Sequence, residues 1–184
     1  MRLKLAARQA FTVANPDILP SSNLKKITIP NVTAFGLRFH HRHVYSITSG
    51  RFQANMTPSL TQSWAESRWS ARTDPFWWSC VPRKETAHMK RTVRSYMARV
   101  VRHAVVESLR KQGLKSDGTS LDGTDGKLLF ATAQFTPESS VLKTPFAEVV
   151  RQTDTALATI IKMVEAQKDR LAVPKRVYKP RRRN

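Results

Sequence analysis

Three histidines within four residues form the densest group of side chains that could do chemistry. His40, His41 and His43 lie beside Arg38 and Arg42. A zinc site would need further Cys, His or acidic ligands, and the one cysteine of the chain has no CxxC partner. Alternation along a strand would also place His40 on the face opposite His41 and His43. We therefore expect RNA contact here, and no metal.

A second group consists of carboxylates, each followed by glycine. Asp117, Asp122 and Asp125 lie in a loop over residues 113–126. Such acids could bind calcium or the two metals of a nuclease, but their order does not follow the EF-hand pattern, and a flexible loop fixes ligands badly. Asp-Gly pairs are typical of turns, so we predict turns here.

Motifs that bind nucleotides or carry out hydrolysis are missing from the sequence. It has no P-loop, no GxGxxG, no GxSxG and no HExxH. It also has no RNP1-like strand, KH-type GxxG segment or zinc knuckle. The sequence therefore predicts no catalytic residue, no metal or cofactor and no small-molecule substrate.

Charge gives the stronger signal. The 184 residues include 32 Lys and Arg against 13 Asp and Glu, a formal net charge of +19. A domain with this charge repels itself unless a polyanion neutralises it, which points to nucleic acid or, less well, an acidic membrane surface. No apolar run approaches the ~18 residues that span a bilayer. DNA is less favoured than RNA as the nucleic-acid partner, because no helix-turn-helix or zinc-finger pattern is present.

The positive charge is spread along the whole chain. Asp17 is the only acid before Glu66, and residues 174–184 carry six cations, no acid and two prolines. We expect this tail to extend along phosphates. The predicted RNA contacts are Arg38, His41, Arg42, Arg68, Arg72, Arg91, Arg94, Arg99, Arg102, Arg110, Lys175, Arg176, Lys179, Arg181, Arg182 and Arg183.

Two amphipathic helices are the clearest elements. The first should follow Pro82 and end before Gly113. Its apolar stripe comprises Met89, Val93, Tyr96, Met97, Val100, Val101, Ala104 and Val105, and five of the arginines above, from Arg91 to Arg110, lie on the other side. The second should follow Thr144 and Pro145 and stop before Pro174. Its stripe comprises Phe146, Val149, Val150, Thr153, Leu157, Ile160, Ile161 and Val164.

Strands are predicted at residues 25–29, 32–39, 44–48 and 127–135. Residues 56–82 contain all four tryptophans together with Arg68 and Arg72, with a short helix over residues 61–71. Aromatic residues beside arginines suit base stacking, whereas burial of tryptophan in a core or protein interface is the alternative.

These elements predict an α+β fold, in which a small antiparallel or mixed sheet is covered on one face by two amphipathic helices. The domain should cover residues 23–173, with a Trp-rich insertion at 56–82. Basic extensions should flank it, an N-terminal one at 1–22 and a C-terminal one at 174–184.

The function expected first is that of a structural, non-catalytic RNA-binding subunit of a large ribonucleoprotein. Within that class we expect a ribosomal protein that binds rRNA and neighbouring proteins. An acid-free start with Arg2, Lys4 and Arg8 resembles a mitochondrial targeting segment, which favours the mitochondrial matrix over the nucleus, nucleolus or cytoplasm. An accessory or catalytic subunit of an RNA-processing enzyme of the ribonuclease P type, and a protein-interaction adaptor that uses the Trp-rich segment, remain as alternatives.

Overall fold

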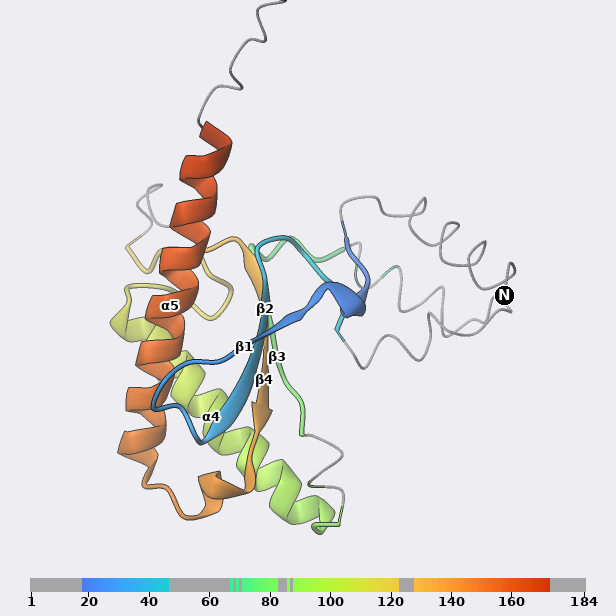
Figure 1. Ribbon diagram of the computed structural model, residues 1–184, viewed down its shortest axis with the longest axis vertical. Helices are drawn as coiled ribbons and strands as arrows, with labels where there is room; N and C mark the ends of the chain where they lie inside the picture. The colour runs from blue at the N-terminus through green and yellow to red at the C-terminus, as the bar shows by residue number, and fades with distance from the viewer. Residues whose placement is uncertain are drawn as a thin grey trace, which may run out of the picture.

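A sheet with two long helices forms the fold in the computed structural model (Figure 1), which describes residues 18–46, 67, 69, 71–82, 86, 88–122 and 128–172. The strands are β1 (Lys25–Ile27), β2 (Phe35–His40), β3 (Phe76–Cys80) and β4 (Ala131–Pro137). The helices are α4 (Arg91–Lys111) and α5 (Phe146–Ala172), with short 3-10 turns η1 (Ser21–Asn23) and η3 (Ser139–Leu142). None of the helices in this described part is long and apolar enough to cross a membrane.

The four strands form one mixed sheet in the order β1-β2-β4-β3. Strand β2 is antiparallel to both β1 and β4, whereas β3 is parallel to β4. The register places Arg38 opposite Gln134 and Trp77 opposite Thr132. The predicted α+β fold with a mixed sheet is therefore confirmed.

Both helices pack on the same face of the sheet, as predicted (Figure 1). Alternate residues of β2 and β4 point into this layer, where the rings of Phe35 and Phe135 meet edge to face with centroids 5.5 Å apart. Val101 of α4 and Leu157 of α5 belong to the same buried cluster. Burial of one apolar stripe per helix stabilises this layer, at about 25 cal/mol per Å² removed from water.

Helix α4 ends as predicted and begins later than predicted. Gly113, at φ 75°, donates its N–H to the carbonyl of Arg110, and Leu114 donates to Leu109, both at 2.9 Å. These two bonds satisfy carbonyls of the last turn, and the left-handed backbone between them favours glycine. The start at Pro82 was wrong: the helix begins at Arg91, after a turn in which Met89 N–H donates to the Thr86 carbonyl.

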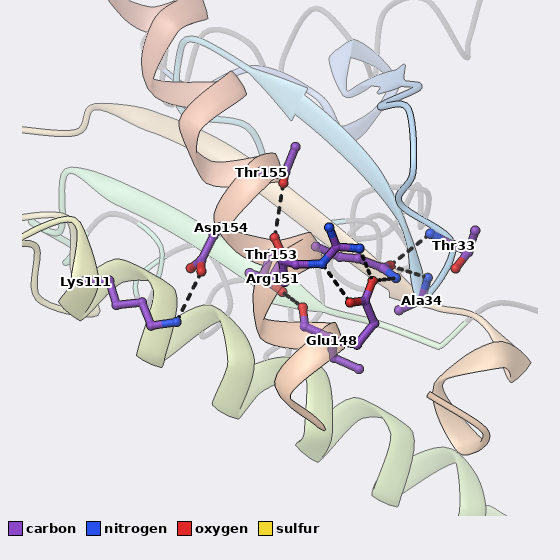
Figure 2. A network of polar contacts seen from close by, with 10 residues as sticks. Thr33, Ala34, Lys111, Glu148, Arg151, Thr153, Asp154 and Thr155 are labelled. Atoms are coloured by element: carbon purple, nitrogen blue, oxygen red, sulfur yellow. Dashed lines mark hydrogen bonds and ion pairs between the residues drawn. The ribbon is translucent and has the colours of Figure 1, made fainter. Parts of the chain in front are cut away.

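A buried glutamine ties α5 to the connection between β1 and β2 (Figure 2). The side-chain oxygen Oε1 of Gln152 accepts the backbone N–H groups of Thr33 and Ala34, each at 2.9 Å. Its Nε2 donates to Glu148, which also accepts two bonds from Arg151. Hydrogen bonds from Arg151 and Gln152 lower the pKa of Glu148 to about 2. Glu148 therefore stays ionised and holds the Gln152 amide in position.

Strand β3 is the element that the sequence did not predict. It lies within the Trp-rich segment at Phe76–Cys80 and pairs with β4, far along the chain. The strand expected at residues 44–48 was wrong in its described part, because Val44 forms only an isolated bridge with Leu19. Of the short helix at 61–71, Ser67 and Trp69 are helical and Ala71 is in a turn; the other residues lie outside the described part.

Two glycines with positive φ provide a matched pair for testing the packing. Gly113 has open space where a Cβ would lie, whereas at Gly118 a Cβ would overlap that of Phe76 and lie 2.8 Å from the Leu129 carbonyl oxygen. Gly113→Ala should cost about 1–2 kcal/mol through backbone strain. Gly118→Ala should cost about 1–3 kcal/mol more through overpacking, measured by urea unfolding. Equal losses in the two variants would contradict the close approach of this loop to β3.

Gln152→Met should destabilise the fold by about 1–3 kcal/mol, because the buried N–H of Ala34 loses its acceptor and methionine, which has a similar shape, accepts no comparable hydrogen bond. Thr155→Ala, at an exposed position of the same helix, should change the free energy of unfolding by less than about 0.5 kcal/mol. Similar values for both variants would argue against the tie between α5 and Ala34.

Candidate nucleic-acid interface

Helix α4 presents a row of arginines to solvent. Packing of Met97, Val101 and Ala104 against the core turns the opposite side of the helix outward. The row consists of Arg91, Arg99, Arg102 and Arg110, all exposed. At 1.5 Å per residue it spans roughly 28 Å along the helix. Within the described part of the chain, none of these four forms an ion pair, and Glu107 is the single acid of α4.

Arg94 does not belong to this row. It is half-buried, and its Nε is buried without a hydrogen-bond partner. The prediction from the sequence that Arg94 faces outward was wrong. Arg94 precedes Met97 by three residues and Val101 by seven, which is the spacing of one helix face, so it lies on the buried side.

A second group of predicted contacts lies at β2. Arg38 alternates with the buried Leu37 and Phe39, so its half-buried side chain lies on the face away from the helices. Arg42 follows the end of the strand and is exposed. His41 stacks on His40 with ring centroids 4.4 Å apart. The expected alternation of these two histidines was wrong, because β2 ends at His40.

The sheet separates these two groups. The α4 row lies on the outer surface of the helical layer, and Arg38 lies on the opposite side of the sheet. The structure therefore does not bring the predicted contacts into one patch. Arg68 and the tail residues Lys175, Arg176, Lys179, Arg181, Arg182 and Arg183 lie outside the described residues, and their roles stay predictions.

Arg72 is engaged within the protein. Its guanidinium lies 4.9 Å from the ring centroid of Trp77 and 5.4 Å from that of Trp69. It also donates two bonds to Asp74, from Nε at 3.1 Å and from Nη2 at 2.9 Å. Because Trp77 is only 2% exposed, it is a core residue and not a free stacking platform. Burial of tryptophan, the alternative to base stacking for the Trp-rich segment, is thus confirmed for Trp77.

His43 belongs to the same aromatic cluster, which was not predicted from the sequence. Its ring stacks on Trp77 at 4.1 Å with an interplanar angle of 3°, and Phe130 lies 4.2 Å away. Nε2 lies 3.1 Å from the Pro75 carbonyl, which can only accept, so Nε2 carries the proton. Burial lowers the pKa of His43. No local pattern reveals this cluster, because its members come from separate parts of the chain.

Cys80 and Asp117 take part in structural contacts. Burial raises the pKa of the Cys80 thiol to about 12, so it stays protonated at neutral pH, and it donates to the Ala98 carbonyl at 3.5 Å. Asp117 accepts the backbone N–H and the hydroxyl of Thr119, which confirms its predicted turn and lowers its pKa. Asp122 is exposed, and Asp125 lies outside the described residues.

Among the described residues, no group of three or more His, Cys, Asp or Glu side chains could hold a metal ion. The described residues thus offer exposed guanidinium groups for anions, whereas His40, His41, His43 and the Cys80 thiol take part in internal contacts. Comparisons with protein-family models, with curated proteins and with solved structures found no match.

His43 should make stability depend on pH. Its folded pKa is lowered from an unfolded value of about 6.5, so its contribution is present above that value and is lost as pH falls toward the folded pKa. The free energy of unfolding should therefore fall as the pH drops below about 6.5 toward the folded pKa. His43→Phe, which keeps a ring on Trp77, should flatten this dependence, and His103→Gln, at an exposed position, should not. Parallel pH profiles for wild type and His43→Phe would contradict this account.

Proposed function

We propose that this chain is a structural RNA-binding subunit of a large ribonucleoprotein, and within that class a mitochondrial ribosomal protein that binds rRNA. The observation that carries the RNA-binding part is the row of Arg91, Arg99, Arg102 and Arg110 along α4. An arginine without an internal ion pair can bond phosphate oxygens with two parallel N–H groups. Contacts of this type position a protein on RNA without reading its sequence.

The spread of charge supports a structural subunit over a module with one binding face. Arg38 lies on the face of the sheet away from α4, Arg42 is exposed after the end of β2, and six more cations are in residues 174–184. A protein embedded in folded RNA meets phosphates on several sides, which suits this distribution. The ribosomal and mitochondrial parts of the proposal rest on the sequence, through the basic extensions and the acid-free start.

The alternatives predict different observations. An RNA-processing subunit of the ribonuclease P type would co-purify with the RNA of that enzyme and not with rRNA, so sequencing RNA from the native complex separates the two. An adaptor would bind its partner with little dependence on salt. The burial of Trp77 gives such an adaptor fewer exposed tryptophans for docking.

RNA affinity should fall steeply as the salt concentration rises, because each neutralised phosphate releases counterions. The slope of log affinity against log salt concentration should have a magnitude of about 0.7–0.9 per phosphate contact. Changing Arg91, Arg99 and Arg102 together to Gln should reduce the magnitude of that slope by about 2–3 and weaken binding to every RNA tested. Fluorescence anisotropy over a range of KCl concentrations measures both quantities.

The matched control removes three charges elsewhere. Lys25, Lys26 and Lys162 are exposed on β1 and α5, so their change to Gln alters net charge equally without touching the α4 row. This control should lower the slope by less than the arginine variant does. Equal effects would show that net charge matters and the α4 row does not, and a wild-type slope near zero would exclude binding through phosphates.

A further inference from the structure

The outer side of α4 contains a hollow beside the start of α5. Its volume is about 800 Å³, and it is lined by Tyr96, Arg99, Val100, His103, Arg110 and Phe146, among others. That volume lies within the range of about 300–1,000 Å³ that small-ligand sites occupy. Because α4 and α5 pack closely, with Ser108 donating its hydroxyl to the Val150 carbonyl, Phe146 is held beside the middle of α4.

Two aromatic rings in this hollow are exposed. Tyr96 is 54% exposed and Phe146 is 45% exposed, although both were predicted to lie in apolar stripes that cover the core. Their expected burial was wrong, because each lies at the margin of its stripe and faces the hollow. Half-buried Val100 and Val106 lie along the same wall. Exposed apolar side chains that gather in one place mark binding sites more often than scattered ones do.

The charge of the lining residues indicates which kind of ligand suits the hollow. Arg99 and Arg110 contribute guanidinium groups that have no ion pair within the described part of the chain, and Glu107 is the one acid among the lining residues. An apolar peptide would leave these cations without a partner. A nucleotide suits both features, since a base has a flat face for an aromatic ring and its phosphate carries the opposite charge.

We propose that this hollow binds unpaired nucleotides of RNA, with bases stacked on Tyr96 and Phe146 and their phosphates held by Arg99 and Arg110. This inference rests on the proposed function and deepens it: α4 recognises a single-stranded loop or bulge beside its general contacts with phosphates. Paired bases cannot reach the rings, because both of their faces are already stacked within the duplex, so the site distinguishes unpaired from paired RNA.

The test compares two fluorescent probes, a 12-nucleotide oligouridine and an RNA duplex of the same length, with full-length protein. Tyr96→Ala should weaken oligouridine binding by about 5- to 150-fold, the range for loss of one stacked base. Phe146→Ala should act in the same direction, and Tyr96→Phe should restore binding. Duplex affinity and the salt dependence should stay unchanged in all three variants, because no cation is removed.

Leu142→Ala and Met163→Ala supply the control, since both side chains are similarly exposed, at 45% and 42%, and neither lines the hollow. If Tyr96→Ala weakens oligouridine binding no more than these controls, or weakens duplex binding equally, the inference is overturned while a steep salt dependence still supports the proposed function. A wild-type slope near zero would instead overturn the proposed function. Circular dichroism checks that each variant is folded.

Discussion

Burial of β4 on both faces is the constraint on which the rest of the fold depends. Every residue of Ala131–Pro137 is buried. Alternate residues from Ala131 to Phe135 pack under the helices, and the polar Thr132, Gln134 and Thr136 lie on the other side, still covered. Buried hydroxyls need hydrogen-bond partners. Thr132 therefore donates to the Arg42 carbonyl and accepts the Val44 N–H, which joins the end of β2 to the centre of the sheet.

This two-sided burial gives the sheet two unlike surfaces. The helical side is an apolar layer that fixes how α4 is rotated about its axis: with Val101 and Val105 at the core, Arg99 and Arg102 must face solvent. The other side holds a small aromatic cluster, in which Trp77 packs with Ile18 and Tyr45. The position of the arginine row thus follows from core packing, and a change in the apolar stripe would rotate the charges with it.

The parts that the sequence predicted are those set by local periodicity. The stripes of α4 and α5, the glycine after α4 and the strands β1 and β2 all depend on residues close together in the chain. Strand β3 is not set by local periodicity, because the adjacent Trp77 and Trp78 break the alternation of apolar and polar residues. Its partner strand β4 begins only at Ala131, far along the chain. Tyr96, Arg94 and Phe146 were misplaced for a related reason. An apolar spacing shows which residues share a stripe, but the width of the contact with neighbouring elements decides which stripe residues are buried.

The aromatic cluster around Trp77 and the hollow on α4 show that aromatic side chains take two roles in this chain. Trp77 and Trp69 are surrounded by protein groups, including the Arg72 guanidinium that Asp74 neutralises. Tyr96 and Phe146 lie beside arginines that no described acid neutralises. An aromatic ring next to an arginine that forms an ion pair is already part of a complete internal contact. A ring next to an arginine without an ion pair leaves its own face open for stacking and the charge of the arginine open for an anion. This difference in neutralisation, and not the number of aromatic residues, favours α4 over the Trp-rich segment as the proposed RNA-binding surface.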